Sequence, residues 1–284
     1  MDAKGVPLTK SGRDRAEGWT HAKLSGHQNE EAVGLALQGD ALSAFAARIG
    51  KTRQTGRVEV GGLHEQSVSC ILGGTTKSKT DMRINWADGT TSNVSIKKRD
   101  GGQLFLIGTE RFMKGFEANF GPIPGKVQRA LSLYIGGSEA LSILRCLPIG
   151  DRNLRRYELR KSRLVWESLE ACGGGLAESL LDWFKRNCGH LASFCFSRGL
   201  GSTPADWAEF IWYRNLIGES DLDELFRVED LVEGSRLSPD LVKPGPRNGG
   251  STILLPFGFL QWHQEQMQFH HRLRDIERII RPLR

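Results

Sequence analysis

The 284-residue sequence has no hydrophobic run that approaches the length needed to cross a bilayer. A membrane-spanning helix requires about 20 mostly apolar residues. The opening stretch, MDAKGVPLTKSGRDR, is polar and lacks the apolar centre of a secretory signal. We therefore expect a cytoplasmic protein without a membrane partner.

Cysteine is scarce and irregularly placed. The five cysteines are an odd number with scattered spacing and no CxxC pair, which argues against a disulfide framework. The segment CGHLASFC offers Cys188, His190 and Cys195 to a zinc ion, but its apolar, helical character favours buried free thiols.

Two common catalytic motifs are also absent. GGTTKSKT has glycines before lysine and threonine, but it lacks the spaced glycine and the GK[ST] ending of a P-loop. No G-x-S-x-G elbow of a serine hydrolase occurs. We expect neither a nucleotide cofactor nor acyl-enzyme chemistry.

Positive charge, in contrast, is in excess. The formal net charge is +6 and the isoelectric point is about 9.2. Basic residues crowd the first 23 positions and flank the segment 80–96. Such a distribution suits a polyanionic partner, although charge alone does not identify one.

Hydrophobic spacing and turn residues predict an α/β (α+β) fold. Residues 1–27 are expected to form an irregular basic arm, followed by a helix over 29–49. Strands are predicted over 57–60, 67–72, 81–86, 91–97 and 103–107, and the last is apolar enough to be buried on both faces. A helix over 109–119 precedes a largely helical C-terminal half, with helices predicted over 125–135, 137–146, 152–171, 174–197, 204–217 and 262–281. A loop over 234–251 and a late strand at 252–255 interrupt it.

The segment 81–97 predicts a hairpin with one apolar and one polar face. The first strand alternates Asp81, Arg83 and Asn85 with Met82, Ile84 and Trp86, and the second alternates Asn93, Ser95 and Lys97 with Val94 and Ile96. The two apolar faces coincide only if the connecting loop has three residues, with Gly89 in the left-handed region. Asp81 then lies opposite Ser95 or Lys97. This pair can be a surface salt bridge or part of a catalytic site.

The order of these residues resembles the core of the PD-(D/E)XK nucleases, and more narrowly the type II restriction endonucleases. Thr80-Asp81, a turn and Ser95-Ile96-Lys97 are similar to the family's aspartate and (D/E)XK triplet, in a D…SxK variant. The helical glutamate would come from Glu30 or Glu31, and the resemblance favours Glu30. The resemblance covers about a third of the chain, and it implies a central mixed β-sheet flanked by helices.

The resemblance also implies a metal site and a division of labour. Asp81, the Ile96 backbone carbonyl and Glu30 (or Glu31) would hold Mg²⁺, while Asp81, Ser95, Lys97 and Glu30 would be the catalytic residues. Ser95 departs from the family pattern, because serine is a poor direct ligand for Mg²⁺. This departure leaves one or two metal ions as alternatives. Periodicity does not choose between Glu30 and Glu31, and both would also suit a helix N-terminus.

The implied protein is a bacterial, cytoplasmic, Mg²⁺-dependent endonuclease that hydrolyses double-stranded DNA at a specific sequence, and it is expected to be a homodimer. One nuclease domain would span 1–284: the basic arm 1–27, a catalytic core 28–122 and a recognition and dimerisation part 123–284. Candidate DNA contacts are Lys23, Lys77, Lys79 and Lys98. The alternatives are a non-catalytic DNA-binding protein and a nuclease of DNA repair or phage defence.

Overall fold

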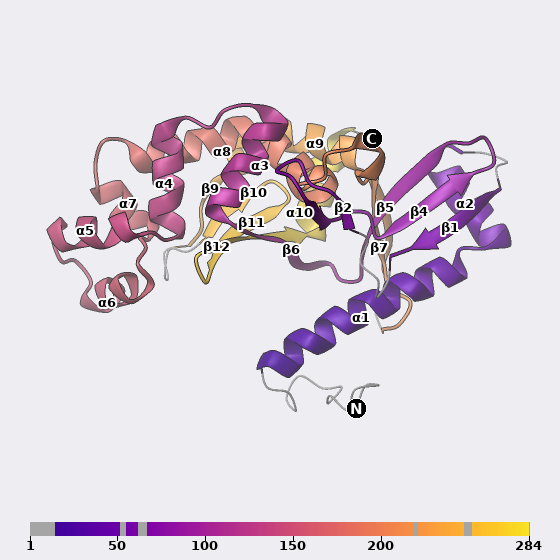
Figure 1. Ribbon diagram of the computed structural model, residues 1–284, viewed down its shortest axis with the longest axis horizontal. Helices are drawn as coiled ribbons and strands as arrows, with labels where there is room; N and C mark the ends of the chain where they lie inside the picture. Colours follow the sequence, from indigo (N-terminus) through magenta and orange to yellow (C-terminus); the bar gives the residue numbers. More distant parts are fainter. Residues whose placement is uncertain (1–14, 52–54, 62–66, 219–220, 247–251, 284) are drawn as a thin grey trace. The chain divides into compact units, whose positions relative to one another are not determined.

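The computed structural model describes residues 15–51, 55–61, 67–218, 221–246 and 252–283, with side chains from residue 24 onward. The chain forms two compact units (Figure 1). Unit 1 comprises Met1–Ser69, Thr75–Asp100 and Gly201–Arg227, and unit 2 comprises Cys70–Gly74, Gly101–Leu200 and Val228–Arg284. That a single nuclease domain spans the chain stays a prediction.

Unit 1 is a mixed β-sheet with two helices. Its elements are α1 (Arg15–Ala36), α2 (Gly39–Arg48), β1 (Gly56–Val60), β2 (Ser67–Ser69), β3 (Thr75–Lys77), β4 (Met82–Trp86), β5 (Thr91–Lys97), β7 (Phe210–Arg214) and β8 (Asp223–Arg227). The strand order is β1-β4-β5-β7-β8, and only β5 and β7 run parallel within it. The predicted mixed sheet flanked by helices is confirmed.

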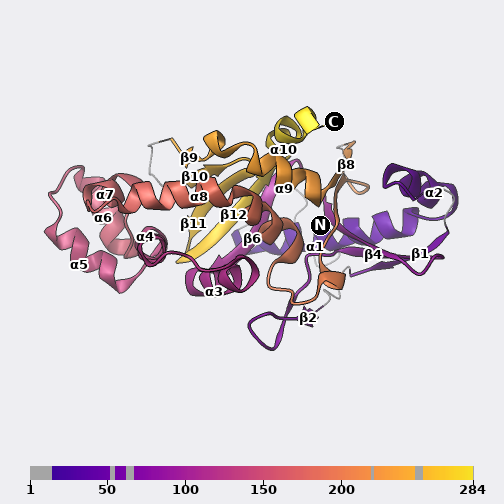
Figure 2. The same cartoon turned by 90° about the horizontal axis from the view of Figure 1, so that it is seen from above.

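The apolar face of this sheet explains its position against α1 and α2. One hydrophobic cluster buries Met82, Ile84, Val94 and Ile96 of the sheet with Val33 of α1, Leu42 and Phe45 of α2, and Leu37 between the two helices. Both helices lie on that side of β1 and β4 in Figure 2. Burying such side chains contributes about 1.5–3 kcal/mol each, so the alternation along β4 and β5 fixes which face is left for polar residues.

The β4–β5 hairpin has the predicted register. Met82 pairs with Val94, and Trp86 N–H donates to the Thr90 carbonyl, so the loop is Ala87-Asp88-Gly89. Gly89 has φ of 79°, in the left-handed region that favours glycine. The hairpin is central in the sheet, because β5 also pairs with β7. The apolar strand after it, β6 (Gly101–Gly108), pairs instead with β12 in unit 2.

Unit 2 combines a helical part with an antiparallel sheet. Its helices are α3 (Thr109–Phe120), α4 (Gly125–Ile135), α5 (Ser138–Cys146), α6 (Arg152–Lys161), α7 (Trp166–Ala171), α8 (Leu176–Ser193), α9 (Val228–Arg236) and α10 (Leu273–Ile280). The sheet has the order β6-β12-β11-β10-β9, with β9 (Lys243–Pro244), β10 (Thr252–Leu255), β11 (Gly258–His263) and β12 (Gln266–Arg272). Helices α3 and α8 lie on the same side of this sheet in Figure 1.

Several predicted segments differ from the structure. Residues 1–14 of the irregular arm predicted over 1–27 lie outside the described residues, and the rest is helical from Arg15, the start of α1. The helix predicted over 204–217 is a short 3₁₀ turn followed by β7, whose run FIWYR suits a buried strand. The segment predicted to be helical over 262–281 is β-structure up to Arg272. Phe269, Leu273, Ile276 and Ile280 fit helical spacing, although the helix α10 begins only at Leu273. The late strand at 252–255 is confirmed.

Candidate functional site

The polar face of the hairpin brings three of the predicted residues together. Asp81, just before β4, accepts hydrogen bonds at Oδ2 from the Ser95 hydroxyl at 3.0 Å and from the Ile96 N–H at 2.7 Å. The Lys97 ammonium donates to Ser95 Oγ at 2.6 Å and to the Ile96 carbonyl at 3.2 Å, and it lies 3.5 Å from Asp81 Oδ2. Carboxylate, hydroxyl, ammonium and a main-chain carbonyl therefore share one site.

Helix α1 is held at this end of the sheet by a residue that the sequence analysis did not single out. Asn29 is fully buried, and its amide donates to the Arg214 carbonyl at 2.7 Å and accepts from Leu216 N–H at 2.8 Å. Both partners lie at the C-terminal end of β7, and β7 runs parallel beside β5. The helix therefore presents the next residue, Glu30, toward the end of β5 that carries Lys97.

The structure distinguishes Glu30 from Glu31. The side chain of Glu30 is 14% exposed, whereas Glu31 is exposed to solvent. Burial, followed by repulsion from the Asp81 carboxylate, raises the pKa of Glu30 from 4.5 to about 7, and His27 and Lys97 oppose this rise. His27 Nδ1 lies 3.1 Å from Glu30 Oε2. Glu30 therefore belongs to the electrostatic environment of Asp81 and Lys97.

The donor set of the site fits a Mg²⁺ ion of the kind that retains several waters. Mg²⁺ prefers oxygen ligands, and one or two carboxylates commonly suffice for it. Asp81 and Glu30 would provide these carboxylates, and a bound cation would relieve the repulsion between them. Within the described residues, no group of three or more His, Cys, Asp or Glu side chains could hold a metal ion. A site here would depend on two carboxylates, the Ile96 carbonyl and water.

The predicted DNA-contacting lysines are dispersed around unit 1. Lys98 follows the site directly, and its ammonium donates to the buried Ser25 hydroxyl of α1. Burial, and then the nearby Arg99, lower the pKa of Lys98. Lys77 is exposed on β3, and Lys79 is half-buried in the loop after it. The side chain of Lys23 lies outside the described residues. Lys98 is thus the candidate next to the carboxylates.

The three candidate zinc ligands, Cys188, His190 and Cys195, lie in different surroundings. Cys188 and Cys195 are buried free thiols, as favoured, and Cys188 Sγ lies 2.8 Å from the Ser235 carbonyl. His190 is exposed and stacks on Phe120. Because the histidine belongs to the surface and the thiols to the core, this segment is not organised as a zinc site.

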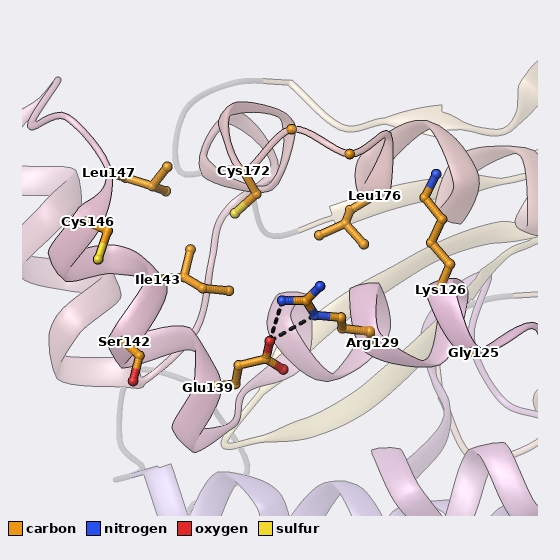
Figure 3. Close-up of a pocket in the computed structure, with 12 residues that line it drawn as sticks. Gly125, Lys126, Arg129, Glu139, Ser142, Ile143, Cys146, Leu147, Cys172 and Leu176 are labelled. Carbon is orange, nitrogen blue, oxygen red and sulfur yellow. Dashed lines mark hydrogen bonds and ion pairs between the residues drawn. The ribbon is translucent and has the colours of Figure 1, made fainter.

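A pocket elsewhere in the structure contains none of the hairpin residues. It has a volume of about 820 Å³ in unit 2 (Figure 3). An ion pair between Arg129 and Glu139 crosses one wall, while Cys146, Cys172 and Leu176 line the others. The residues of the hairpin site lie in unit 1, outside this pocket. Among the helices that the structure describes, none is long and apolar enough to traverse a membrane.

The chain can be compared with known proteins by family, by sequence and by structure. No protein-family model matches the chain, and no curated protein matches it. Among solved structures, the chain is similar to the crystal structure of the restriction endonuclease MspI in complex with its cognate DNA. The TM-score is 0.48, and the sequences are 12% identical, with 94% of each chain covered. The description of the site therefore depends on the contacts within this chain.

Proposed function

We propose that this protein is a Mg²⁺-dependent endonuclease that hydrolyses double-stranded DNA at a specific sequence, as type II restriction enzymes do. The observation that carries the proposal is the convergence of Glu30 from α1 with Asp81, Ser95 and Lys97 from the hairpin. Two carboxylates beside one ammonium suit a phosphodiester, whose hydrolysis develops negative charge on the phosphate oxygens.

Each side chain has a role that follows from its contacts. Asp81 and Glu30 would hold Mg²⁺ together with the Ile96 carbonyl, and the ion would polarise the scissile phosphate and activate a water molecule. Lys97 supplies positive charge to the phosphate as that charge develops. Ser95 fixes the ammonium and the carboxylate relative to each other through its two hydrogen bonds. No nucleophilic side chain is required, because water attacks phosphorus.

The site-specific part of the proposal rests on the sequence resemblance and on the size of unit 2. A homodimer that reads a palindromic site is the arrangement that restriction by such an enzyme favours. Sedimentation of the protein alone and with duplex DNA tests this arrangement.

One observation favours the alternative of a non-catalytic DNA-binding protein. Asp81 Oδ2, Ser95 and Lys97 already satisfy one another, as a structural salt bridge would. Cleavage of unmethylated phage DNA, with Mg²⁺ and with EDTA, separates the possibilities when Asp81→Asn is assayed beside the wild type. Discrete fragments that require Mg²⁺ and Asp81 support the proposal. A smear indicates a nuclease of repair or phage defence, and DNA binding without cleavage supports the alternative.

A further inference from the structure

One face of the sheet of unit 2 carries glutamine side chains from three strands, together with Leu106, Leu254 and Phe259. Along β12, Met267, Phe269 and His271 are buried, while the alternate residues are half-buried. Phe269 packs on Phe112 of α3, which identifies the buried side as the one facing the helices. The opposite side carries glutamine, histidine and basic residues. Its principal members, named here the glutamine face, are Gln103, Phe259, Gln261, Gln268, His270 and Arg272.

The pairing of the strands places these side chains in rows. Gln261 lies opposite Gln268, and Phe259 lies opposite His270. The Gln268 amide donates to Gln103 Oε1 at 2.6 Å, at an exposed position on β6. Opposed residues of an antiparallel pair share one face, so the amides form a continuous surface over three strands.

Stacking of Phe259, His270 and Arg272 positions the arginine at one end of this face. The Phe259 and His270 rings are parallel within 5°, with their centroids 4.4 Å apart, and the Arg272 guanidinium lies 4.6 Å from the Phe259 ring centroid. Burial, and then Arg272, lower the pKa of His270, which favours the neutral ring in the stack. Arg272 keeps 38% of its side chain exposed, so its donors remain accessible.

The charges of the face suit an anionic partner. Its strands contribute Arg272 and the exposed Lys243 of β9, and no carboxylate stands on the described face strands. The nearby acids lie beside it: Asp275 is 3.9 Å from Arg272, and Glu265, in the β11–β12 turn, leans toward Gly136 at the end of α4.

The β11–β12 pair is flanked by β6 and β10 in the sheet and is closed by a tight turn. The two turn residues, Gln264 and Glu265, both have positive φ, as a tight two-residue hairpin requires. The major groove of DNA admits a two-stranded β-ribbon. Glutamine amides pair with adenine edges and arginine with guanine edges there.

We propose that the glutamine face enters the major groove of duplex DNA, with Gln261 and Gln268 contacting base edges and Arg272 and Lys243 flanking them. This inference rests on the proposed function, since it assigns the surface by which the nuclease would choose its sequence. Its content is separate from the chemistry of the hairpin, because it concerns preference among sequences.

The test is selection of bound duplexes from a random 30-base-pair pool, with Ca²⁺ in place of Mg²⁺ and, in parallel, with EDTA. The wild type is expected to enrich a defined sequence. The double variant Gln261→Ala/Gln268→Ala is expected to lose preference roughly tenfold or more at one or more base pairs, with an unchanged salt dependence of total binding. The control Gln38→Ala removes an exposed glutamine of unit 1 and is expected to retain the preference.

Three results overturn the inference: the double variant enriches the same sequence as strongly as the wild type, it changes oligomeric state without changing preference, or the wild type binds no duplex. Thermal unfolding of the double variant must match that of the wild type; if it does not, Gln261→Glu/Gln268→Glu, which repels DNA at the same positions, replaces it. Cleavage with unaltered fragments in the double variant sinks the inference alone. Variant-dependent selection by a protein that never cleaves sinks the proposed function alone.

Discussion

The hydroxyl of Ser95 lies 3.0 Å from Asp81 Oδ2, and it occupies the position at which the PD-(D/E)XK pattern that the sequence resembles has an acid. Ser95 is also almost fully buried, with 3% of its surface exposed. A carboxylate at this position would face Asp81 directly, so the serine reduces the negative charge that the site must neutralise. This relationship has a testable consequence for metal binding.

Ser95→Asp is expected to destabilise the protein by about 2 kcal/mol or more at pH 8 in EDTA, because it buries a second carboxylate against Asp81. Added Mg²⁺ is expected to restore part of the lost melting temperature, since a ligand of the folded state stabilises it. Ser92→Asp is the matched control, because Ser92 is equally buried but bonds to Trp86 Nε1. If Mg²⁺ rescues both variants alike, the effect is not local to the site.

The two neighbouring glutamates provide a second comparison. Glu30→Gln is expected to lower the cleavage rate about 100-fold or more, since it removes one of the two carboxylates of the site. Glu31→Gln makes the same chemical change on an exposed residue one position along and is expected to leave the rate nearly unchanged. Single-turnover rates on one cleavable duplex measure both. Equal losses, or a loss confined to Glu31→Gln, would refute the assignment of Glu30.

The raised pKa of Glu30 predicts a pH dependence of stability. The folded protein holds this proton up to about pH 7, whereas the unfolded chain releases it near 4.5. The stability that the protonated group contributes is present below pH 4.5 and is lost as pH rises through 7. Above this range the ionised group costs up to about 3 kcal/mol.

Glu30→Gln, which cannot ionise, is therefore expected to melt at a higher temperature than the wild type at pH 8 without metal, and at a similar temperature at pH 4.5. Denaturation curves in EDTA at both pH values measure the difference. A variant that is less stable than the wild type at pH 8 would contradict the raised pKa.

Asn29 is expected to act as a positioning residue for α1. Asn29→Ala removes two buried hydrogen bonds and leaves the Arg214 carbonyl and the Leu216 N–H without their partner, at a cost of about 2–4 kcal/mol. The exposed neighbour serves as control in Gln28→Ala, which is expected to change stability by less than about 0.5 kcal/mol.

The role in positioning is separated from stability by the Mg²⁺ dependence of cleavage below the melting temperature. Displacement of Glu30 raises the Mg²⁺ concentration needed for half-maximal rate in Asn29→Ala. A destabilised variant with an unchanged Mg²⁺ requirement would make Asn29 a purely structural residue.

The sequence carried most of the information for the hairpin, because alternation over 81–97 and the odd loop leave only registers that keep both faces intact, with Asp81 opposite Ser95 or Lys97. It did not reveal the partner of β5. The run FIWYR of β7 lies more than a hundred residues later, and nothing in its local pattern identifies that pairing. The same limit applies to Asn29, whose importance depends on backbone groups at the end of β7. The strand predicted over 103–107 is β6, whereas the segment of β12 was predicted to be helical, because Phe269, Leu273, Ile276 and Ile280 also fit helical spacing.

The most direct test of the account is the cleavage rate of Lys97→Ala beside Lys114→Ala, with duplex DNA and Mg²⁺. Lys114 is an exposed lysine paired with Glu110 on α3, so its removal controls for the loss of one positive charge. The account predicts that Lys97→Ala binds DNA and unfolds cooperatively, as the wild type does, but cleaves DNA about 100–1,000-fold more slowly. Lys114→Ala is predicted to cleave at the wild-type rate. Cleavage by Lys97→Ala at the wild-type rate would contradict the account, and the contacts of Asp81, Ser95 and Lys97 would then be structural.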